Sequence, residues 1–291
     1  MYPSRFGYEA PRAIDEAIDL LTRGQGEAKI LAGGQSLIPM LKLRFANPEM
    51  LVDINNLPGL AYHRVAADGS LHVGALCRHG DLERAEGLGG AFPTLAAAAP
   101  LVADPIVRNR GTLVGSICHA DPQGDWAAVA IATGASVVAQ GPRGRRAVPV
   151  AEFVTGPFTH VLDHDEIAVE VVFPAPKGTP AGGYLKLERR VGDFATAGVG
   201  ISLERNGSTV TRAGVALTGV GGATINASDA AAALVGGELT ADRIARAADA
   251  AAAAANPRSD HRGSAAYKRH IVHTFVTRIL ARVADDVERA A

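Results

Sequence analysis

The chain has 291 residues, of which 47% are hydrophobic and 20% are charged, a balance that is ordinary for globular proteins. Its 29 lysines and arginines nearly cancel its 30 aspartates and glutamates, which argues against a nucleic-acid-binding or disordered chain. Two cysteines cannot build a disulfide scaffold or a four-cysteine metal site, and no apolar run approaches the ~20 residues of a membrane span. The first residues lack the apolar region of a secretory signal. We therefore expect a globular, cytoplasmic protein of about two domains.

The first half of the sequence alternates segments typical of helices and strands. The apolar spacing of residues 11–21 predicts a helix with Pro11 in its first turn, and residues 28–31 predict a short buried strand. Ser36 is a candidate N-cap for a helix that runs to Leu41. Further strands are expected at 50–54, 60–65, 71–75, 136–140 and 166–173, and further helices at 79–86 and 126–133.

The second half changes from alternation to segregation. Residues 174–183 hold three prolines and three glycines and are the strongest linker candidate in the chain. Strands first and helices afterwards are typical of an α+β domain. The strands are expected at 184–188, 197–204 and 209–217, and the helices at 227–235, 240–255 and 264–287.

A glycine pair after the strand at 28–31 is the first candidate binding loop. Gly33 and Gly34 precede Ser36 and the next expected helix, so backbone N–H groups at the helix start could hold a phosphate. The spacing fits neither the dinucleotide-binding Rossmann pattern nor the P-loop. On this segment alone, a plain glycine-rich turn with a helix cap is the more common arrangement.

A second candidate loop follows Arg110. It carries Gly111 and Thr112, then Gly115 and Ser116, and ends with Asp125 before an apolar helix. Hydroxyls and glycine amides can serve phosphates, and a carboxylate can bind ribose hydroxyls. The alternative is a turn followed by Asp125 as an N-cap. Two such loops in one chain favour a large diphosphate-bearing cofactor over a small anion.

Other chemistry-bearing residues form weaker patterns. Cys118 beside His119 could suggest a nucleophile pair, but a buried thiol next to a polar histidine is the more common arrangement. His270 and His273 are one helical turn apart and lack a third metal ligand. The sequence therefore predicts neither catalytic residues nor a metal site.

Five segments occur in a recognisable order along the whole chain. They are AGGQSL at 32–37, LVDI at 51–54, DPIVRNRGT at 104–112, HADP at 119–122 and RVGDFA at 190–195. The ordered set resembles the FAD-binding medium subunits of molybdenum hydroxylases, the family of carbon monoxide dehydrogenase and xanthine dehydrogenase. No single segment is specific, but their order is.

The resemblance implies an α+β fold of two domains. The first, at 1–177, would be a two-lobed FAD-binding domain of the vanillyl-alcohol-oxidase type (PCMH-type), with lobes at about 1–56 and 57–177. The second, at 178–291, would be a smaller α+β flavoprotein domain with a three-stranded antiparallel sheet and helices.

The resemblance also implies a set of FAD-binding residues. Loop 32–37 and the second loop would hold the diphosphate, Asp125 would lie toward the ribose, and Val102 and Leu162 would pack on the cofactor. Lys186 would lie near the flavin. Phe194 stands where relatives often have tyrosine, so it would contact the ring without a hydroxyl for any hydrogen bond to it. Val114 replaces the first glycine of a pair that is typical of the family. The expected contacts are Ala32, Gly33, Gly34, Gln35, Ser36, Leu37, Val102, Gly111, Thr112, Gly115, Ser116, Asp125, Leu162, Lys186 and Phe194.

The implied function is electron transfer through a non-covalent FAD. Electrons would come from a small subunit with 2Fe-2S clusters and a large subunit with molybdopterin, in an (LMS)2 heterohexamer, and would leave to an external acceptor. No nucleic-acid partner is expected. Two alternatives remain: a self-sufficient FAD-dependent oxidase or reductase of the same domain type, and an assembly module that has lost its cofactor.

Overall fold

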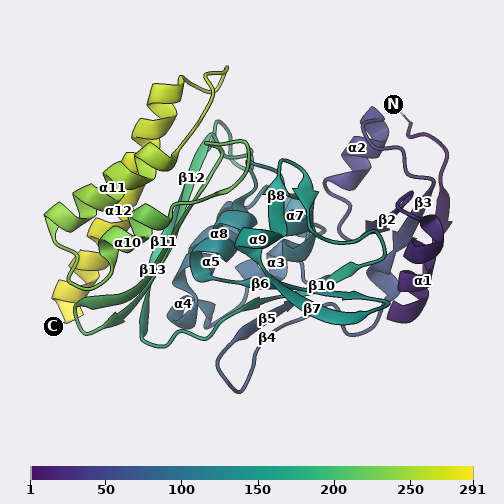
Figure 1. Cartoon of the computed structure of the whole chain (residues 1–291), viewed down its shortest axis with the longest axis horizontal. Helices are drawn as coiled ribbons and strands as arrows, with labels where there is room; N and C mark the ends of the chain where they lie inside the picture. Colours follow the sequence, from purple (N-terminus) through teal and green to yellow (C-terminus); the bar gives the residue numbers. More distant parts are fainter. Residues whose placement is uncertain (1, 291) are drawn as a thin grey trace.

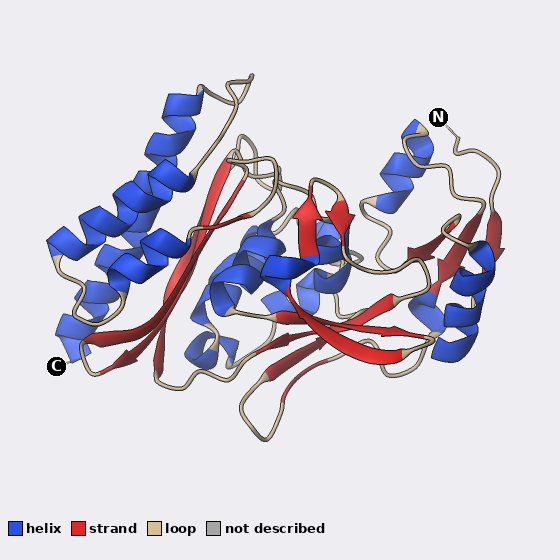
Figure 2. Cartoon of the chain, viewed as in Figure 1, coloured by secondary structure: helices blue, strands red, loops and turns tan. Residues whose placement is uncertain are grey.

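Three units of mixed helix and sheet follow one another along the chain (Figure 1). The computed structural model describes residues 2–290, and it describes the side chains of residues 2–286. Two separate hydrophobic cores hold the molecule together. One lies under the first two units, and the other lies between the last sheet and the C-terminal helices. Figure 2 shows helices and strands mixed in the first two units, whereas in the third unit the strands form one sheet and the helices lie together beside it.

The first lobe is a small parallel sheet covered by a helix. Its strands are β1 (Gly7–Glu9), β2 (Ala28–Leu31) and β3 (Met50–Asp53), in the order β1-β3-β2. Helix α1 (Ile14–Gly24) buries Ala17, Ile18 and Leu21. It begins three residues later than predicted, so Pro11 precedes the helix instead of lying in its first turn. Strand β2 leads through the glycine pair into α2 (Leu37–Leu43).

The second lobe is a five-stranded antiparallel sheet with short helices above it. The strand order is β4-β5-β10-β6-β7. These strands are β4 (His63–Val65), β5 (Leu71–Gly74), β6 (Ser136–Gly141), β7 (Gly144–Pro149) and β10 (Ile167–Phe173). The helices are α3 (His79–Glu83), α4 (Leu88–Ala91), α5 (Pro93–Ala98), α6 (Pro105–Arg108), α7 (Leu113–His119), α8 (Asp125–Thr133) and α9 (Val150–Phe153). A small hairpin of β8 (Val154–Gly156) and β9 (Thr159–His160) completes the lobe.

Helix α8 connects the second lobe to the third unit. All but one of its nine residues are buried, and the exception, Ile131, is half-buried. A helix that is apolar all round must be covered on every side. Helices α5 and α8 pack on one face of the third sheet, and the C-terminal helices pack on its other face (Figure 1).

The third unit is an antiparallel sheet followed by three helices. Its strands are β11 (Thr179–Leu187), β12 (Ala197–Asn206), β13 (Thr209–Thr218) and β14 (Ile225–Asn226), in sequence order. The helices are α10 (Ser228–Leu234), α11 (Ala241–Ala254) and α12 (Ala265–Ala290). The predicted three-stranded sheet therefore has a fourth strand, two residues long. Across residues 2–290, no helix is both long and apolar enough to cross a membrane.

Two predicted segments differ in kind from the structure. Strand β11 starts at Thr179, inside the predicted linker, because Gly182 lets its backbone approach β12 closely: a Cβ there would lie 2.1 Å from the Ile201 oxygen. Helix α7 occupies the second candidate loop, where no helix was expected. Thr112 begins this helix by accepting a hydrogen bond from the Gly115 amide at 3.1 Å, and so caps a segment of weak helix formers.

Candidate functional site

The two candidate loops lie against each other at the junction of the first two units. A Cβ on Gly33 would lie 2.3 Å from the carbonyl oxygen of Arg110 and 2.9 Å from the Cα of Gly111. Such distances are far below van der Waals contact, so only glycine allows the two backbones to meet here. Segments that are far apart in the sequence thus form one backbone surface.

The first loop has the backbone geometry that glycine favours. Gly34 has a φ of +74°, and a Cβ there would crowd Ile38 and Leu31 at 3.1 and 3.2 Å. Ser36 stands at the N-cap position of α2, but its backbone is helical and its side chain makes no capping hydrogen bond. The predicted capping role of Ser36 is therefore wrong. Ala32, Gly34 and Leu37 are half-buried, and Gln35 is exposed.

A buried histidine, His79, packs against the second loop. A Cβ on Gly111 would lie 2.7 Å from Nε2 of His79, and the His79 amide donates to the Gly111 carbonyl at 2.9 Å. The Trp126 indole donates to His79 Nδ1 at 2.9 Å, which assigns the ring proton to Nε2. Burial, with help from the Arg108 and Arg78 cations, lowers the pKa of His79 to about 4. The ring is therefore neutral at pH 7.

Two residues that the sequence did not single out link these loops. The Arg78 guanidinium donates to the Arg110 carbonyl at 2.8 Å and to Asn55 Oδ1 at 2.6 Å. The Asn55 side-chain amide in turn donates to the Ala32 carbonyl at 2.9 Å. No motif marks these residues, because their partners are distant in sequence and are brought together only by the fold.

Asp125 is engaged by groups of the third unit. Tyr184 donates to its Oδ1, and Lys186 Nζ lies 3.3 Å from its Oδ2. Burial raises the pKa of Asp125, against the opposing effect of Lys186, and burial also raises the pKa of Tyr184. Asp125 is the first residue of α8 and Gly124 is the N-cap, so the N-cap alternative is wrong. Both carboxylate oxygens already have partners within the chain.

Lys186 joins two backbone segments beside Phe194. Its ammonium donates to the carbonyls of Leu101 and Asp193, and its side chain is 1% exposed. Gly192, with a φ of +90°, lies against Asp104: a Cβ there would be 3.0 Å from that residue. The Phe194 side chain remains half exposed, and its carbonyl accepts from Arg262 at 3.1 Å.

The remaining predicted residues differ in how deeply they are buried. Val102 is 6% exposed and belongs to the first core, and Leu162 packs half-buried at the edge of that core. The segment around Leu162 reaches the first lobe, since a Cβ on Gly26 would lie 4.0 Å from the Cβ of His164. Ser116 is half-buried in the first turn of α7, next to Gly115.

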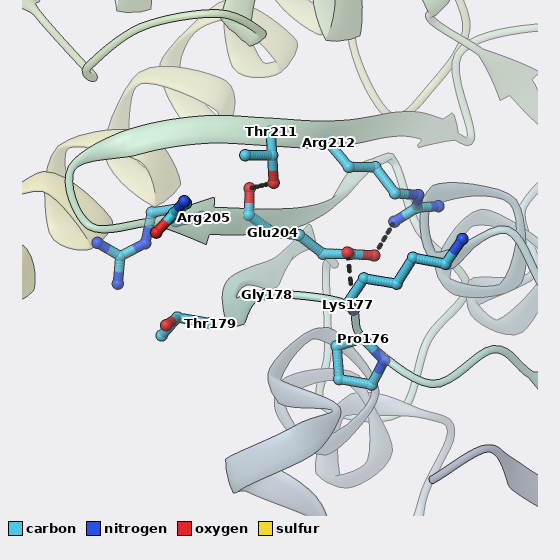
Figure 3. Close-up of a pocket in the computed structure, with 9 residues that line it drawn as sticks. Pro176, Lys177, Gly178, Thr179, Glu204, Arg205, Thr211 and Arg212 are labelled. Carbon is cyan, nitrogen blue, oxygen red and sulfur yellow. Dashed lines mark hydrogen bonds and ion pairs between the residues drawn. The ribbon is translucent and has the colours of Figure 1, made fainter. Parts of the chain in front are cut away.

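A surface hollow lies apart from these residues. It has a volume of about 750 Å³ and lies between the 176–179 segment and strands β12 and β13 (Figure 3). Glu204 accepts from the Lys177 amide at 2.9 Å and faces Arg212 at 3.6 Å. None of the predicted site residues lines this hollow. Its contacts attach the connecting segment to the third sheet.

The two cysteines and the possible metal ligands give no further site. Burial raises the pKa of both Cys77 and Cys118 to about 12, so neither thiol is a nucleophile at neutral pH. Among the described side chains, no group of three or more histidines, cysteines and carboxylates is placed to hold a metal ion.

Comparison with known families identifies the family of the chain. Residues 4–176 match the family of the FAD binding domain in molybdopterin dehydrogenase, and residues 183–283 match the CO dehydrogenase flavoprotein C-terminal domain. The chain belongs to the family of FAD-binding medium subunits of molybdenum hydroxylases. The predicted family and the α+β fold class are thus confirmed, and the alternative of a self-sufficient oxidase finds no support.

Relatives of this medium-subunit family match along their full length. The carbon monoxide dehydrogenase medium chain of Hydrogenophaga pseudoflava is 41% identical over 96% of this chain and 97% of its own. The glyceraldehyde dehydrogenase medium chain of Sulfolobus acidocaldarius is 34% identical over 98% of this chain and 100% of its own. Among solved structures, carbon monoxide dehydrogenase from H. pseudoflava has a TM-score of 0.92 at 43% identity, covering 97% of this chain and 98% of the other. Quinoline 2-oxidoreductase from Pseudomonas putida 86 has a TM-score of 0.90 at 31% identity, covering 99% of both chains.

Proposed function

We propose that this chain holds one non-covalent FAD at the contact of its two glycine loops and passes electrons through it to an external acceptor. The contact between Gly33 and the Arg110–Gly111 backbone carries the proposal. It brings the backbones of both loops into direct contact, so a diphosphate bound at this contact would meet both loops at once. The retained glycines of both loops favour this proposal over an assembly module that has lost its cofactor.

The residues present suit an FAD that extends from the first lobe toward the third unit. In this proposal loop 32–37 holds the diphosphate together with Thr112, Gly115 and Ser116, and the half-exposed Phe194 ring lies against the flavin. Lys186 and Asp125 contribute indirectly, because their contacts fix the positions of the backbone segments around them. Val102 and Leu162 supply apolar packing. FAD, when bound, supplies exchange between one-electron and two-electron carriers, and the chain binds and orients it.

Non-covalent attachment follows from the chemistry of the loops. Residues 32–37 contain neither cysteine nor histidine. In the second loop the Cys118 thiol is kept protonated because burial raises its pKa to about 12. Neither loop therefore offers an activated cysteine to the flavin.

The electron donor in this proposal is a 2Fe-2S small subunit, supplied in turn by a molybdopterin large subunit. The names of the relatives support such partners, since they are medium chains or subunits of dehydrogenases. We further propose an (LMS)2 heterohexamer in the cytoplasm. Within the chain we place the domain boundary at 177/178, which falls between the two matched family segments.

The direct test is the flavin content of the purified chain and of its native complex. One FAD per chain, released entirely into the supernatant by acid precipitation, is expected. A colourless chain that does not take up added FAD would overturn the proposal. Flavin that stays in the acid pellet would contradict non-covalent binding. The stoichiometry is tested separately by native mass spectrometry of the complex.

A further inference from the structure

A single guanidinium connects the backbones of both glycine loops. Arg78 Nη1 donates to the Arg110 carbonyl at 2.8 Å, directly before Gly111. Arg78 Nη2 donates to Asn55 Oδ1 at 2.6 Å, and Asn55 Nδ2 donates to the Ala32 carbonyl at 2.9 Å, directly before Gly33. The chain of hydrogen bonds thus ends on the two residues that precede the glycines in contact.

The orientation of the Asn55 amide is fixed by its neighbours. Its Nδ2 group also approaches Asp53 Oδ1 at 2.5 Å, and its backbone amide donates to the same oxygen at 2.9 Å. A flipped amide would place its oxygen against the Asp53 carboxylate and the Ala32 carbonyl, and its NH₂ group against the guanidinium. Each of these contacts would be repulsive, so only one orientation satisfies all partners. Tyr8 holds the other Asp53 oxygen at 2.6 Å.

Arg78 is also held at its backbone. It pairs with Thr112 as an isolated antiparallel bridge, and its amide donates to Asp81 Oδ2 at 2.9 Å at the start of α3. The guanidinium therefore projects from a fixed point of the second lobe to the edge of the first. Two donors of one planar fork are used at once, which a lysine ammonium on its flexible stem cannot reproduce.

We propose that Arg78 and Asn55 are positioning residues that set the spacing between the two glycine loops and so determine how tightly the chain binds a diphosphate. This inference rests on the proposed FAD site, but it assigns the affinity to an internal hydrogen-bond bridge and not to a direct charge contact. A charge contact would survive the exchange of arginine for lysine. A bridge that depends on the fork would not.

The experiment uses the full chain freed of flavin and measures dissociation constants for FAD and for ADP, which shares the diphosphate but lacks the flavin. We expect Arg78→Lys and Asn55→Ala each to weaken both ligands at least ~tenfold, as the loss of a hydrogen bond to a charged group predicts. The double variant should be little weaker than either single variant, because both break the same bridge. Arg246→Lys is the matched control: it lies on α11 in an exposed pair with Asp242, apart from both loops, and this variant should bind both ligands normally.

Wild-type affinity in Arg78→Lys, or full additivity in the double variant, would overturn the bridge while leaving the FAD site intact. A wild-type chain that binds neither ligand would instead overturn the proposed function itself, and the inference with it. Thermal melting of the ligand-free variants guards against misfolding. If Arg78→Lys melts early, Asn55→Asp gives the same test, since it keeps the side-chain shape but replaces the donor to Ala32 with an acceptor.

Discussion

Lys186 and Asp125 form an ion pair, with 3.3 Å between Nζ and Oδ2, that joins strand β11 to the first turn of α8. Both side chains are almost fully buried, at 1% and 7% exposed. A second carboxylate, Glu188, lies 3.2 Å from the same ammonium. One cation thus pairs with a buried and a partly buried carboxylate, and it also donates to the backbone that leads to Phe194.

Removal of this cation should be costly. Lys186→Met removes the cation beside the buried Asp125 carboxylate, and breaking one side of a buried pair typically costs about 3–5 kcal/mol. The free energy of unfolding of the full chain, measured by denaturant titration, should fall by this order. Lys177→Met is the control, because Lys177 is exposed and its change should cost at most about 0.5 kcal/mol. Equal stability of the two variants would contradict the structural role of Lys186.

The stability of the chain should depend on pH through His79. Its pKa is about 4 in the folded chain and 6.5 as an unperturbed side chain, so the unfolded state binds one more proton between these values. Stability due to this group is complete above pH 6.5 and is lost as the pH falls toward 4, by about 3 kcal/mol over the window.

The matched variant for His79 is His79→Gln, whose side-chain oxygen can still accept from Trp126. Between pH 6.5 and pH 4, the free energy of unfolding of this variant should fall less steeply than that of the wild type. The difference in slope should correspond to one bound proton. Parallel curves for the variant and the wild type would show that His79 is not the group responsible.

The glycine contact predicts the effect of a single methyl group. Gly33→Ala places a Cβ 2.3 Å from the Arg110 carbonyl oxygen, so the two loops must separate. We expect the flavin content to fall below a tenth of wild type, with the fold retained. Gly90→Ala provides the control, since a Cβ there meets no atom within 4 Å. Absorbance at the flavin band relative to protein measures the outcome, and a fully loaded Gly33→Ala chain would remove this contact from the FAD site.

Local patterns predicted most of the elements because they depend on neighbouring residues. The strand at 28–31 and the apolar helix around Trp126 were expected from periodicity alone. Helix α7 was not, because Gly115 and Ser116 are weak helix formers and the Thr112 cap is visible only once the turn has formed. The start of strand β11 was missed because its prolines and glycines are typical of a linker.

The site was predictable where it depends on backbone freedom and not where it depends on topology. Gly33 and Gly111 were predicted as site residues from their place in glycine-rich loops, although nothing in the sequence indicates that the two loops are in contact. Asn55 and Arg78 carry no motif, since each owes its place to partners in another segment. The sequence did not indicate that Asp125 contacts Tyr184 and Lys186, because these partners come from the other matched family segment.

Electron transfer through a partner is tested most directly by anaerobic flavin reduction. The FAD-loaded chain is assayed alone and after reconstitution with its molybdenum and iron–sulfur subunits, against aldehydes, N-heterocycles and carbon monoxide. We predict that no substrate bleaches the flavin of the isolated chain, and that bleaching appears only after reconstitution. Flavin reduction by any of these substrates in the isolated chain would contradict the account.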